Sequence, residues 1–402
     1  MMKNPDDDTA GYAVNMPVKI IVLIVCFFSA SNQAKADIGL SEWTGVERIV
    51  AIGDIHGDFK AFRKLLLETK LINKRNRWIG GKTHFVQVGD VPDRGPDSRK
   101  VMDLLMKLEG QAAKAGGRVH ALIGNHEAMN IAGDLRYVDA GEYKAFVDRK
   151  SQRRQQAYYE NTIKYLQNTL APEQLPTFDD TYKAQWLERY PLGYVEHRAA
   201  WAPGGKYGRW VREHNSVIKI NGTLFVHGGI SPKHRGRSLD EMNAIIRSEL
   251  TQGDQLPDTA LANDQLGPLW YRGLSKVVET CEIQVEINQL LKAYNAQRIV
   301  VAHTPVAGAI VSRYNNRLVM VDVGLSAHYG GARAALVIEG DELSVMHEGK
   351  RLSPLVPAAG YLANASSATT VTAPLFERFL KRLNGVNLDR SLDCSTPNAE
   401  VP

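Results

Sequence analysis

Short β-branched runs in this chain end repeatedly in glycine-flanked clusters of acidic, histidine and amide side chains. The runs are typical of strands, and the segments Phe59–Leu71 and Ser98–Leu108 between the first of them have helical spacing. The strand candidates are Arg48–Ile52, His84–Val88, Arg118–Ile123, Val217–Ile220, Thr223–Val226, Arg298–Ala302, Leu318–Val321, Ala334–Ile338 and Leu343–Met346. Alternation of strands and helices predicts an α/β fold built in layers. The Asn221-Gly222 pair between two later runs predicts a hairpin, and so antiparallel additions to the sheets.

Each polar cluster follows the carboxyl end of a predicted strand. The clusters are Gly53-Asp54-Ile55-His56-Gly57-Asp58, Gly89-Asp90-Val91-Pro92-Asp93-Arg94-Gly95, Gly124-Asn125-His126-Glu127, His227-Gly228-Gly229 and His303. Open α/β folds bind their ligands at this edge of the sheet. Flanking glycines allow the backbone to turn sharply there. We therefore expect these polar side chains to converge on one site.

Six side chains of the clusters are of the kinds that bind borderline divalent metals. They are Asp54, His56, Asp90, Asn125, His227 and His303. A mixed set of oxygen and nitrogen ligands favours Mn, Fe or Zn over Ca or Mg. Six ligands exceed what one four-coordinate site needs, so they favour two metal ions about 3.5–4 Å apart, with Asp90 bridging them. Such a centre keeps a net positive charge and would hold a hydroxide and a phosphate dianion.

Three neighbouring residues have roles beside such a centre. Arg94 offers a planar fork of donors to phosphate oxygens. His126 can protonate a leaving alkoxide, and Asp93 can accept a hydrogen bond from the other ring nitrogen of His126. Several further histidines match no motif and are expected to be hydrogen-bonded or surface residues: His120, His197, His214, His234 and His347.

The motifs GDIHGD, GDVPDRG, GNHE, HGG and AHTP follow one another between about Arg48 and Glu339. In this order they resemble the signature of the metallophosphoesterase superfamily, specifically of its phosphoprotein phosphatase family. The resemblance implies an α/β fold, the calcineurin-like metallophosphoesterase sandwich of two mixed sheets flanked by helices, here with a helical insertion. It implies one metal ion held by Asp54, His56 and Asp90, and a second held by Asp90, Asn125, His227 and His303. It also implies His126 as general acid, Asp93 as its partner and Arg94 as a phosphate clamp.

A second clamp arginine is expected in the later half of the chain. Arg272, in the sequence LWYRG, is the best match to that residue of the family. The segment Ser326–Gly331 resembles the SAPNY-type loop of the family but is one residue shorter. The helical insertion, the WYRG element and the predicted export signal together resemble the bacterial Shewanella-like protein phosphatases.

The chain is expected to divide into a leader, an enzyme domain with an insertion, and a tail. The apolar run Ile20–Ala30 follows Lys19 and precedes the small-x-small triplet Ala34-Lys35-Ala36. The run is too short for a membrane span, which needs about 20 apolar residues. It predicts a signal peptide over residues 1–36, with a possible start at Met16. We expect a metallophosphoesterase domain over 46–350 with a helical, cap-like insertion at 130–214, and a tail over 351–402 with a short amphipathic helix at Leu375–Leu383.

The predicted leader implies a periplasmic or secreted protein. The formal net charge of +5 over 402 residues is well short of a nucleic-acid-binding signature, so we expect no nucleic-acid partner. No stable membrane span is expected after the leader is removed. Two cysteines then remain, Cys281 and Cys394, which could pair in an oxidising compartment or stay as two buried thiols.

The sequence thus predicts a metal-dependent phosphatase, a dinuclear phosphomonoesterase. Metal-bound hydroxide would attack phosphorus in line while Arg94 and Arg272 hold the phosphate and His126 protonates the leaving group. The expected substrate is a protein phosphorylated on tyrosine or on serine/threonine, or a small phosphomonoester. A dinucleoside polyphosphatase or a cyclic phosphodiesterase is an alternative, because related hydrolases share the motifs. A catalytically silent metal-binding module is a further alternative, which the intact set of ligands and acid–base residues disfavours.

Overall fold

A computed structural model describes residues 39–275, 279–306, 308–352 and Cys394. The predicted signal peptide and the helix expected at Leu375–Leu383 therefore lie outside the described residues. Among the helices that are described, none is long and apolar enough to cross a bilayer. The helices and strands described below all belong to the compact unit that begins at Ser41.

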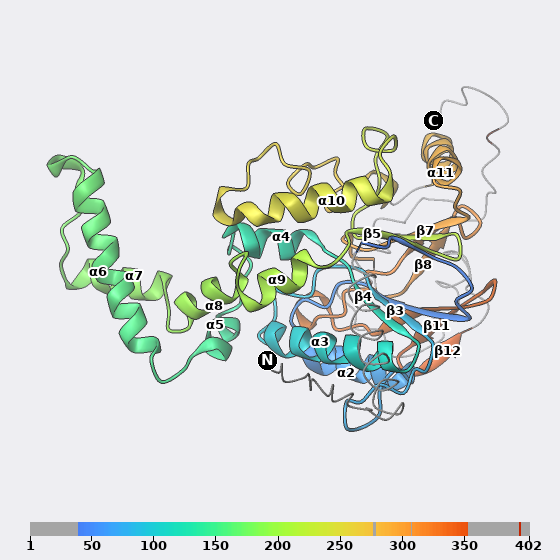
Figure 1. The fold of residues 1–402 in the computed structure, drawn as a ribbon, viewed down its shortest axis with the longest axis horizontal. Coiled ribbons are helices and arrows are strands. Elements are labelled where there is room, and N and C mark those ends of the chain that lie inside the picture. Colours follow the sequence, from blue (N-terminus) through green and yellow to red (C-terminus); the bar gives the residue numbers. More distant parts are fainter. Residues whose placement is uncertain (1–38, 276–278, 307, 353–393, 395–402) are drawn as a thin grey trace, which may run out of the picture. The chain divides into compact units, whose positions relative to one another are not determined.

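The first sheet combines three parallel strands with an antiparallel extension (Figure 1). The parallel strands are β2 (Arg48–Ile52), β3 (His84–Gln87) and β4 (Arg118–Ala121). The antiparallel strands are β10 (Ala334–Glu339), β11 (Glu342–His347) and β12 (Lys350–Leu352). In the order β12-β11-β10-β2-β3-β4, the parallel strands occupy one half of the sheet and end at one edge.

The second sheet has a similar organisation, with the order β1-β5-β6-β7-β9-β8. Its parallel strands β6 (Thr223–Val226), β7 (Arg298–Val301) and β9 (Leu318–Met320) lie next to one another. The other strands are β1 (Glu42–Trp43), β5 (Val217–Ile220) and β8 (Val311–Arg313). Buried residues of both sheets belong to one continuous apolar core.

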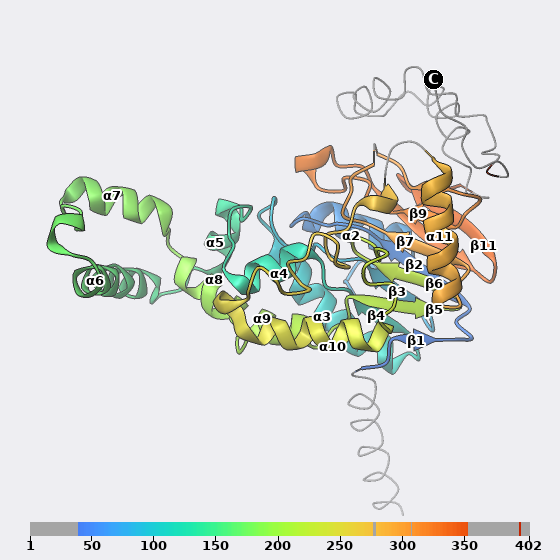
Figure 2. The same cartoon turned by 90° about the horizontal axis from the view of Figure 1, so that it is seen from above.

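Amphipathic helices flank the sheets, which confirms the predicted fold class. Helices α2 (Phe59–Glu68) and α3 (Ser98–Lys114) follow β2 and β3 and lie side by side, with buried stripes such as Leu65 and Leu105. Helix α4 (Asn125–Ala132) follows β4. Helices α10 (Leu239–Glu249) and α11 (Cys281–Ala293) accompany the second sheet (Figure 2). Burial of these stripes stabilises the layers at roughly 25 cal/mol per Å² of apolar surface removed from water.

Two helix ends differ from the sequence expectation. Helix α2 stops at Glu68 instead of Leu71, because Thr69 is its C-cap and Lys70 turns left-handed with φ 57°. Helix α3 continues past Leu108 to Lys114, since the buried stripe extends to Ala112. The short edge strands β1, β8 and β12 were not predicted.

The chain between α4 and β5 is helical and rich in aromatic contacts. Its helices are α5 (Ala140–Phe146), α6 (Ser151–Thr169), α7 (Asp180–Arg189), α8 (Tyr194–Trp201) and α9 (Lys206–Arg212), and it contains the 3₁₀ turn η1 (Pro172–Gln174). Three more 3₁₀ turns lie later in the chain: η2 (Leu250–Gln255), η3 (Gly273–Ser275) and η4 (Ala327–Tyr329). The rings of Tyr159 and Trp186 join α6 to α7 with centroids 5.1 Å apart. In both views α6 and α7 lie farther from the sheets than α5, α8 and α9 do.

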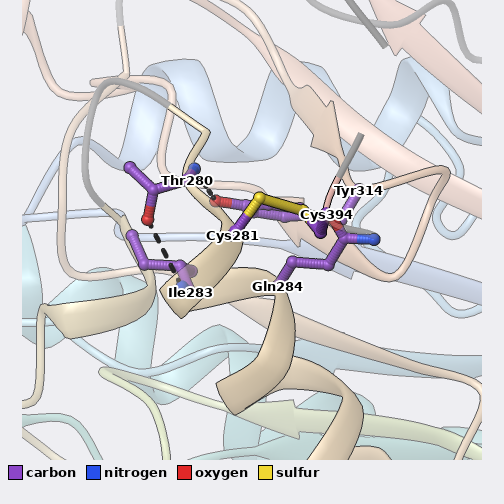
Figure 3. The surroundings of a disulfide bond; sticks show 6 residues. All are labelled: Thr280, Cys281, Ile283, Gln284, Tyr314 and Cys394. Atoms are coloured by element: carbon purple, nitrogen blue, oxygen red, sulfur yellow. Dashed lines mark hydrogen bonds between the residues drawn. A yellow bond between two sulfur atoms is a disulfide. The ribbon is translucent and has the colours of Figure 1, made fainter. Parts of the chain in front are cut away.

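A disulfide joins Cys281, at the start of α11, to Cys394, with their Cα atoms 5.5 Å apart (Figure 3). Thr280 caps α11 by accepting from the Ile283 N–H, and its own N–H donates to the Tyr314 hydroxyl at 3.1 Å. Of the two alternatives that the sequence leaves open for these cysteines, the structure shows the paired one.

Candidate metal centre

Five strands, three from the first sheet and two from the second, deliver the polar side chains to one place. Strands β2, β3 and β4 lead into Asp54, Asp90 and Asn125. Strands β6 and β7 lead into His227 and His303. The two sheets meet closely at these ends, since a Cβ on Gly53 would lie 2.5 Å from the Val321 carbonyl oxygen of the other sheet. A residue with a side chain would not fit there.

The first candidate ligand group consists of Asp54, His56 and Asp90. The Nε2 atom of His56 lies 3.6 Å from Asp54 Oδ2 and 4.0 Å from Asp90 Oδ2. All three side chains are buried. The His56 Nδ1 atom lies 3.1 Å from the Pro92 carbonyl oxygen, a contact that directs Nε2 into the cluster.

The second candidate ligand group is centred on His227. Its Nε2 atom lies 3.0 Å from Asn125 Oδ1, 3.1 Å from Asp90 Oδ2 and 3.1 Å from His303 Nδ1. Its Nδ1 atom lies 2.8 Å from the Val88 carbonyl oxygen, which fixes the ring in this orientation. Asp90 belongs to both groups, as a bridging ligand must. The structure therefore brings together all six side chains that the sequence singles out.

The donor chemistry of the cluster fits two cations. His227 Nε2 carries at most one proton, yet it faces three atoms that can each offer an electron pair. Burial alone would lower the pKa of His227, but Asp90 and Asp54 raise it to about 10. Burial alone would raise the pKa of Asp90, but His227 and His126 hold it well below its usual value. The buried carboxylates of Asp54 and Asp90 thus stand among nitrogen and oxygen donors that divalent cations could bind, in both ligand groups.

The predicted acid–base pair lies beside the cluster. His126 Nδ1 lies 2.5 Å from Asp93 Oδ2, and His126 Nε2 faces Asp90 Oδ2 at 3.8 Å. Burial would lower the pKa of His126, but the charge of Asp90 and then the hydrogen bond to Asp93 raise it. The Asn130 side-chain amide donates to Asp93 Oδ1 at 2.9 Å. His126 therefore presents Nε2 to the site while Asp93 holds the opposite nitrogen.

Both predicted phosphate-binding arginines lie next to the cluster. The Arg94 guanidinium lies 3.8 Å above the centre of the Tyr137 ring, and that ring is 5.2 Å from the ring of His126. Arg272 donates to the His303 carbonyl oxygen at 2.6 Å and to the Thr304 hydroxyl at 3.1 Å. Arg94 thus stands beside His126 and Arg272 beside the second ligand group.

Backbone strain is concentrated in this region. His56, Asp90, Asp93, Arg94 and His303 all have positive φ, between 46° and 72°. Residues other than glycine rarely adopt this conformation, and it persists only where the surroundings enforce it. The sequence does not predict this strain, because none of the five is a glycine, the residue type that marks a left-handed backbone.

Sequence reasoning missed Asp322 and assigned no role to Glu127, although it placed Glu127 in one of the polar clusters. Asp322 follows β9 just as Asp90 follows β3, and its carboxyl, buried beside Asp54, has a pKa raised well above the usual value by burial and by the Asp54 charge. The position of Asp322 at a strand end was the available signal. Glu127 accepts the N–H groups of Asp90 at 3.0 Å and of Val91 at 2.7 Å, so it fixes the loop that carries the bridging ligand.

Two tyrosines and a further glutamate also border the site. The Tyr329 ring lies 5.2 Å from the His56 ring, so the shortened Ser326–Gly331 loop still brings an aromatic residue to the cluster. Tyr137 and Glu142 come from the segment after α4, and both contact the Asp93-Arg94 loop. No motif marks Tyr137 or Glu142, whereas Tyr329 lies in the segment that resembles the SAPNY-type loop.

Comparisons with known proteins agree with this geometry. Residues 47–307 match the family model of the calcineurin-like phosphoesterases. The chain is 30% identical over 315 residues to Shewanella-like protein phosphatase 2 of Arabidopsis thaliana, covering 75% of this chain and 77% of that protein. It is 29% identical over 300 residues to Shewanella-like protein phosphatase 1 of Plasmodium berghei, covering 72% and 70%. The crystal structure of a cold-active protein-tyrosine phosphatase of a psychrophilic Shewanella species superposes with a TM-score of 0.60 at 27% identity, covering 79% of this chain and 84% of that one.

Proposed function

The chain belongs to the calcineurin-like phosphoesterase family and is a metal-dependent phosphatase, and on this basis we propose that it hydrolyses phosphomonoesters of proteins on a dinuclear centre. The observation that carries the proposal is the His126–Asp93 pair beside two ligand groups that share Asp90. When bound, two divalent cations of the Mn, Fe or Zn type supply Lewis-acid charge and activate water.

The chain's own residues then bind the phosphate and move one proton. Arg94 and Arg272 hold the non-bridging oxygens from two sides of the cluster. His126 donates the proton from Nε2 to the leaving oxygen, and Asp93 stabilises the charged ring before transfer. Stabilisation of the transferring group by these donors does not require a covalent phosphoenzyme.

Support for a protein substrate comes from the relatives. The names of the curated relatives designate them as protein phosphatases, and that of the Shewanella enzyme as a protein-tyrosine phosphatase. The partly buried tyrosines Tyr137 and Tyr329 border the candidate centre and could contact an aryl group of a substrate. We propose phosphotyrosine or phosphoserine/threonine peptides as substrates, with the helical segment 130–214 capping the site and helping to select among them.

A metal-reconstituted activity panel on the chain from Asp37 to Pro402 tests this function. It compares phosphotyrosine, phosphoserine and phosphothreonine peptides with a dinucleoside polyphosphate and an aryl phosphodiester. Hydrolysis of the peptides, with little turnover of the last two substrates, is the expected result. Preference for the dinucleoside polyphosphate would favour the alternative hydrolase class. Bound metal without hydrolysis of any substrate would indicate a silent module.

We also propose that the protein is exported to the periplasm or secreted. The apolar run before Ala34-Lys35-Ala36 has the features of a signal peptide. The Cys281–Cys394 disulfide supports this location, because structural disulfides persist mainly in oxidising compartments.

A further inference from the structure

The loop that carries Asp93, the partner of His126, is held by a buried carboxyl group from the helical segment 130–214. Glu142 Oε1 accepts the backbone N–H of Asp93 at 2.8 Å. Glu142 lies in α5, whose first turn is capped by Asp139, and its side chain is 1% exposed. A carboxyl group in so buried a position is costly unless it has a specific partner. The partner of Glu142 is the Asp93 N–H, in the loop that carries the acid–base pair.

The Asp93-Arg94 backbone needs such an external partner. Both residues are left-handed, with φ of 72° and 65°, and neither is glycine. Two consecutive residues in this conformation are strained and persist only if other groups fix them. Glu142 holds the first N–H, and the Tyr137 carbonyl oxygen accepts the second, from Arg94, at 2.9 Å. Both partners come from the chain just after α4, so this segment fixes the loop that bears the acid partner and the phosphate clamp.

The Asp93 side chain depends on that backbone position. One carboxylate oxygen is taken by His126 and the other by the Asn130 amide, and the residue is fully buried. Because both carboxylate oxygens are bound, the side chain cannot adjust to a rotation of the backbone and still keep both hydrogen bonds. A displacement at the N–H of Asp93 would therefore rotate or weaken the hydrogen bond to His126, without contact with any metal ligand.

We propose that Glu142 is a positioning residue for proton donation, which acts by fixing the Asp93 backbone and through it the orientation of His126. The inference rests on the proposed phosphomonoesterase function. It adds a specific task for the helical segment 130–214: this segment supports the acid–base pair as well as covering the site. The required property of Glu142 is an acceptor oxygen at one place, because the hydrogen bond from Asp93 forms with either protonation state of the carboxyl group.

A pair of conservative variants separates this role from a charge effect. Glu142→Gln keeps an acceptor oxygen at the same reach on a side chain that cannot ionise. Glu142→Asp keeps an ionisable carboxyl group and withdraws the acceptor by one methylene. Glu173→Asp, at an exposed acidic residue of the same segment, is the matched control. Each full-length, metal-loaded variant is assayed on 4-nitrophenyl phosphate, whose leaving group needs little protonation, and on a phosphoserine peptide, whose leaving alkoxide needs a proton.

Glu142→Asp is expected to lower kcat on the phosphoserine peptide by about 10-fold or more and on 4-nitrophenyl phosphate by less than about 3-fold, since general acid catalysis typically contributes 10²–10⁴-fold. Glu142→Gln should restore most of the activity on the peptide, and Glu173→Asp should match the wild type. The metal content should be the same in all of these proteins. The NMR resonance of the proton between His126 and Asp93 should shift in Glu142→Asp and stay in place in Glu142→Gln.

Three outcomes would overturn the inference: equal loss on both substrates, a loss in Glu142→Gln that Glu142→Asp lacks, or wild-type rates and an unshifted resonance in Glu142→Asp. Failure of the function itself looks different, because then the wild type hydrolyses neither substrate. The NMR comparison does not depend on turnover, so it decides the positioning role in that case as well.

Discussion

Asp90 is the residue on which the whole candidate centre depends. Its Oδ2 atom lies 3.1 Å from His227 Nε2 and 4.0 Å from His56 Nε2, so it is the only one of the six predicted ligands that belongs to both groups. We expect Asp90→Asn to remove bound metal and to lower kcat by at least about 100-fold, because an amide cannot bridge two cations as a carboxylate does. Metal analysis of the purified protein, alongside the phosphopeptide assay, measures both effects.

The control is Asp341→Asn, an exposed residue of the β10–β11 turn that should leave metal content and rate unchanged. Retention of two metal ions per chain by Asp90→Asn would contradict the bridging role.

His126 should affect turnover without affecting metal binding. Its Nδ1 is engaged by Asp93, and Nε2 stands 3.8 Å from the bridging carboxylate. We expect His126→Ala to keep its metal and to slow hydrolysis of an alkyl phosphate by about 100-fold or more, with a smaller loss on an aryl phosphate. Steady-state kinetics on a series of leaving groups of graded pKa tests this. Wild-type rates on the poorest leaving group would refute the assignment of His126 as general acid.

The difference between predicted and missed site residues has a physical basis. Asp54 and Asp90 could be found because each follows an apolar run and is flanked by glycine. Asp322 also follows such a run, but it reaches the site because the ends of the two sheets meet, which places its carboxyl group beside Asp54. Only the fold brings these two residues together. Glu142 lies in a helix, without a neighbouring motif, and contacts Asp93 across 49 positions of the chain. Contacts of this kind are determined by tertiary packing.

At the scale of single elements, helix α8 carries a histidine that makes its folding sensitive to acid. His197 is fully buried among aromatic rings, and neither ring nitrogen has a hydrogen-bond partner among the described residues, although its Nε2 atom lies 3.8 Å from Oε2 of the buried Glu142. The expectation that it is a hydrogen-bonded or surface histidine is therefore wrong. Burial, and then the charge of Arg198, lower the pKa of His197 to about 3.

The effect on stability follows from comparison with the unfolded chain, where the pKa of a histidine is about 6.5. The unfolded state binds more protons between these two pKa values, so the free energy of unfolding is highest above pH 6.5 and falls as the pH drops towards 3. His197→Phe should abolish this contribution and gain about 1–2 kcal/mol over the wild type between pH 6.5 and pH 5. Urea unfolding at pH 8, 6.5 and 5 measures it.

Phe178→Leu, in the same helical segment, is the control and should change stability equally at each pH, since it removes no titratable group. Parallel pH dependence of wild type and His197→Phe would show that His197 is not the source of the acid sensitivity.

The elements that could be predicted are those with strong local patterns. Buried strands such as Thr223–Val226 read as continuous apolar runs, and the predicted bounds of β2, β5 and β6 are confirmed. The two-residue strand β1 could not be found, because it exists only through its pairing with β5. Helix α3 exceeds its predicted length because Glu109-Gly110-Gln111 interrupts the apolar spacing after Leu108, while Ala112 still packs on the core.

At the scale of the whole molecule, the state of the three cysteines depends on both the removal of the leader and the formation of the disulfide. Cys26 lies in the predicted signal peptide, whereas Cys281 and Cys394 are paired. Cleavage after Ala36 would therefore leave a mature chain that begins at Asp37 and contains no free thiol. The same chain kept in the reducing cytosol should retain Cys26 and show three reactive thiols after unfolding.

Expression with the leader in a Gram-negative host, followed by N-terminal sequencing and thiol titration of the periplasmic fraction, tests both points together. A double variant, Cys281→Ser with Cys394→Ser, is the control, because it should still be processed at Ala36 while losing the link between α11 and Cys394. Its free energy of unfolding should fall by up to about 2–4 kcal/mol, the range typical of native disulfides. A periplasmic chain that retains Lys19 would refute cleavage after Ala36, and free thiols in a chain that begins at Asp37 would show that export does not require the disulfide.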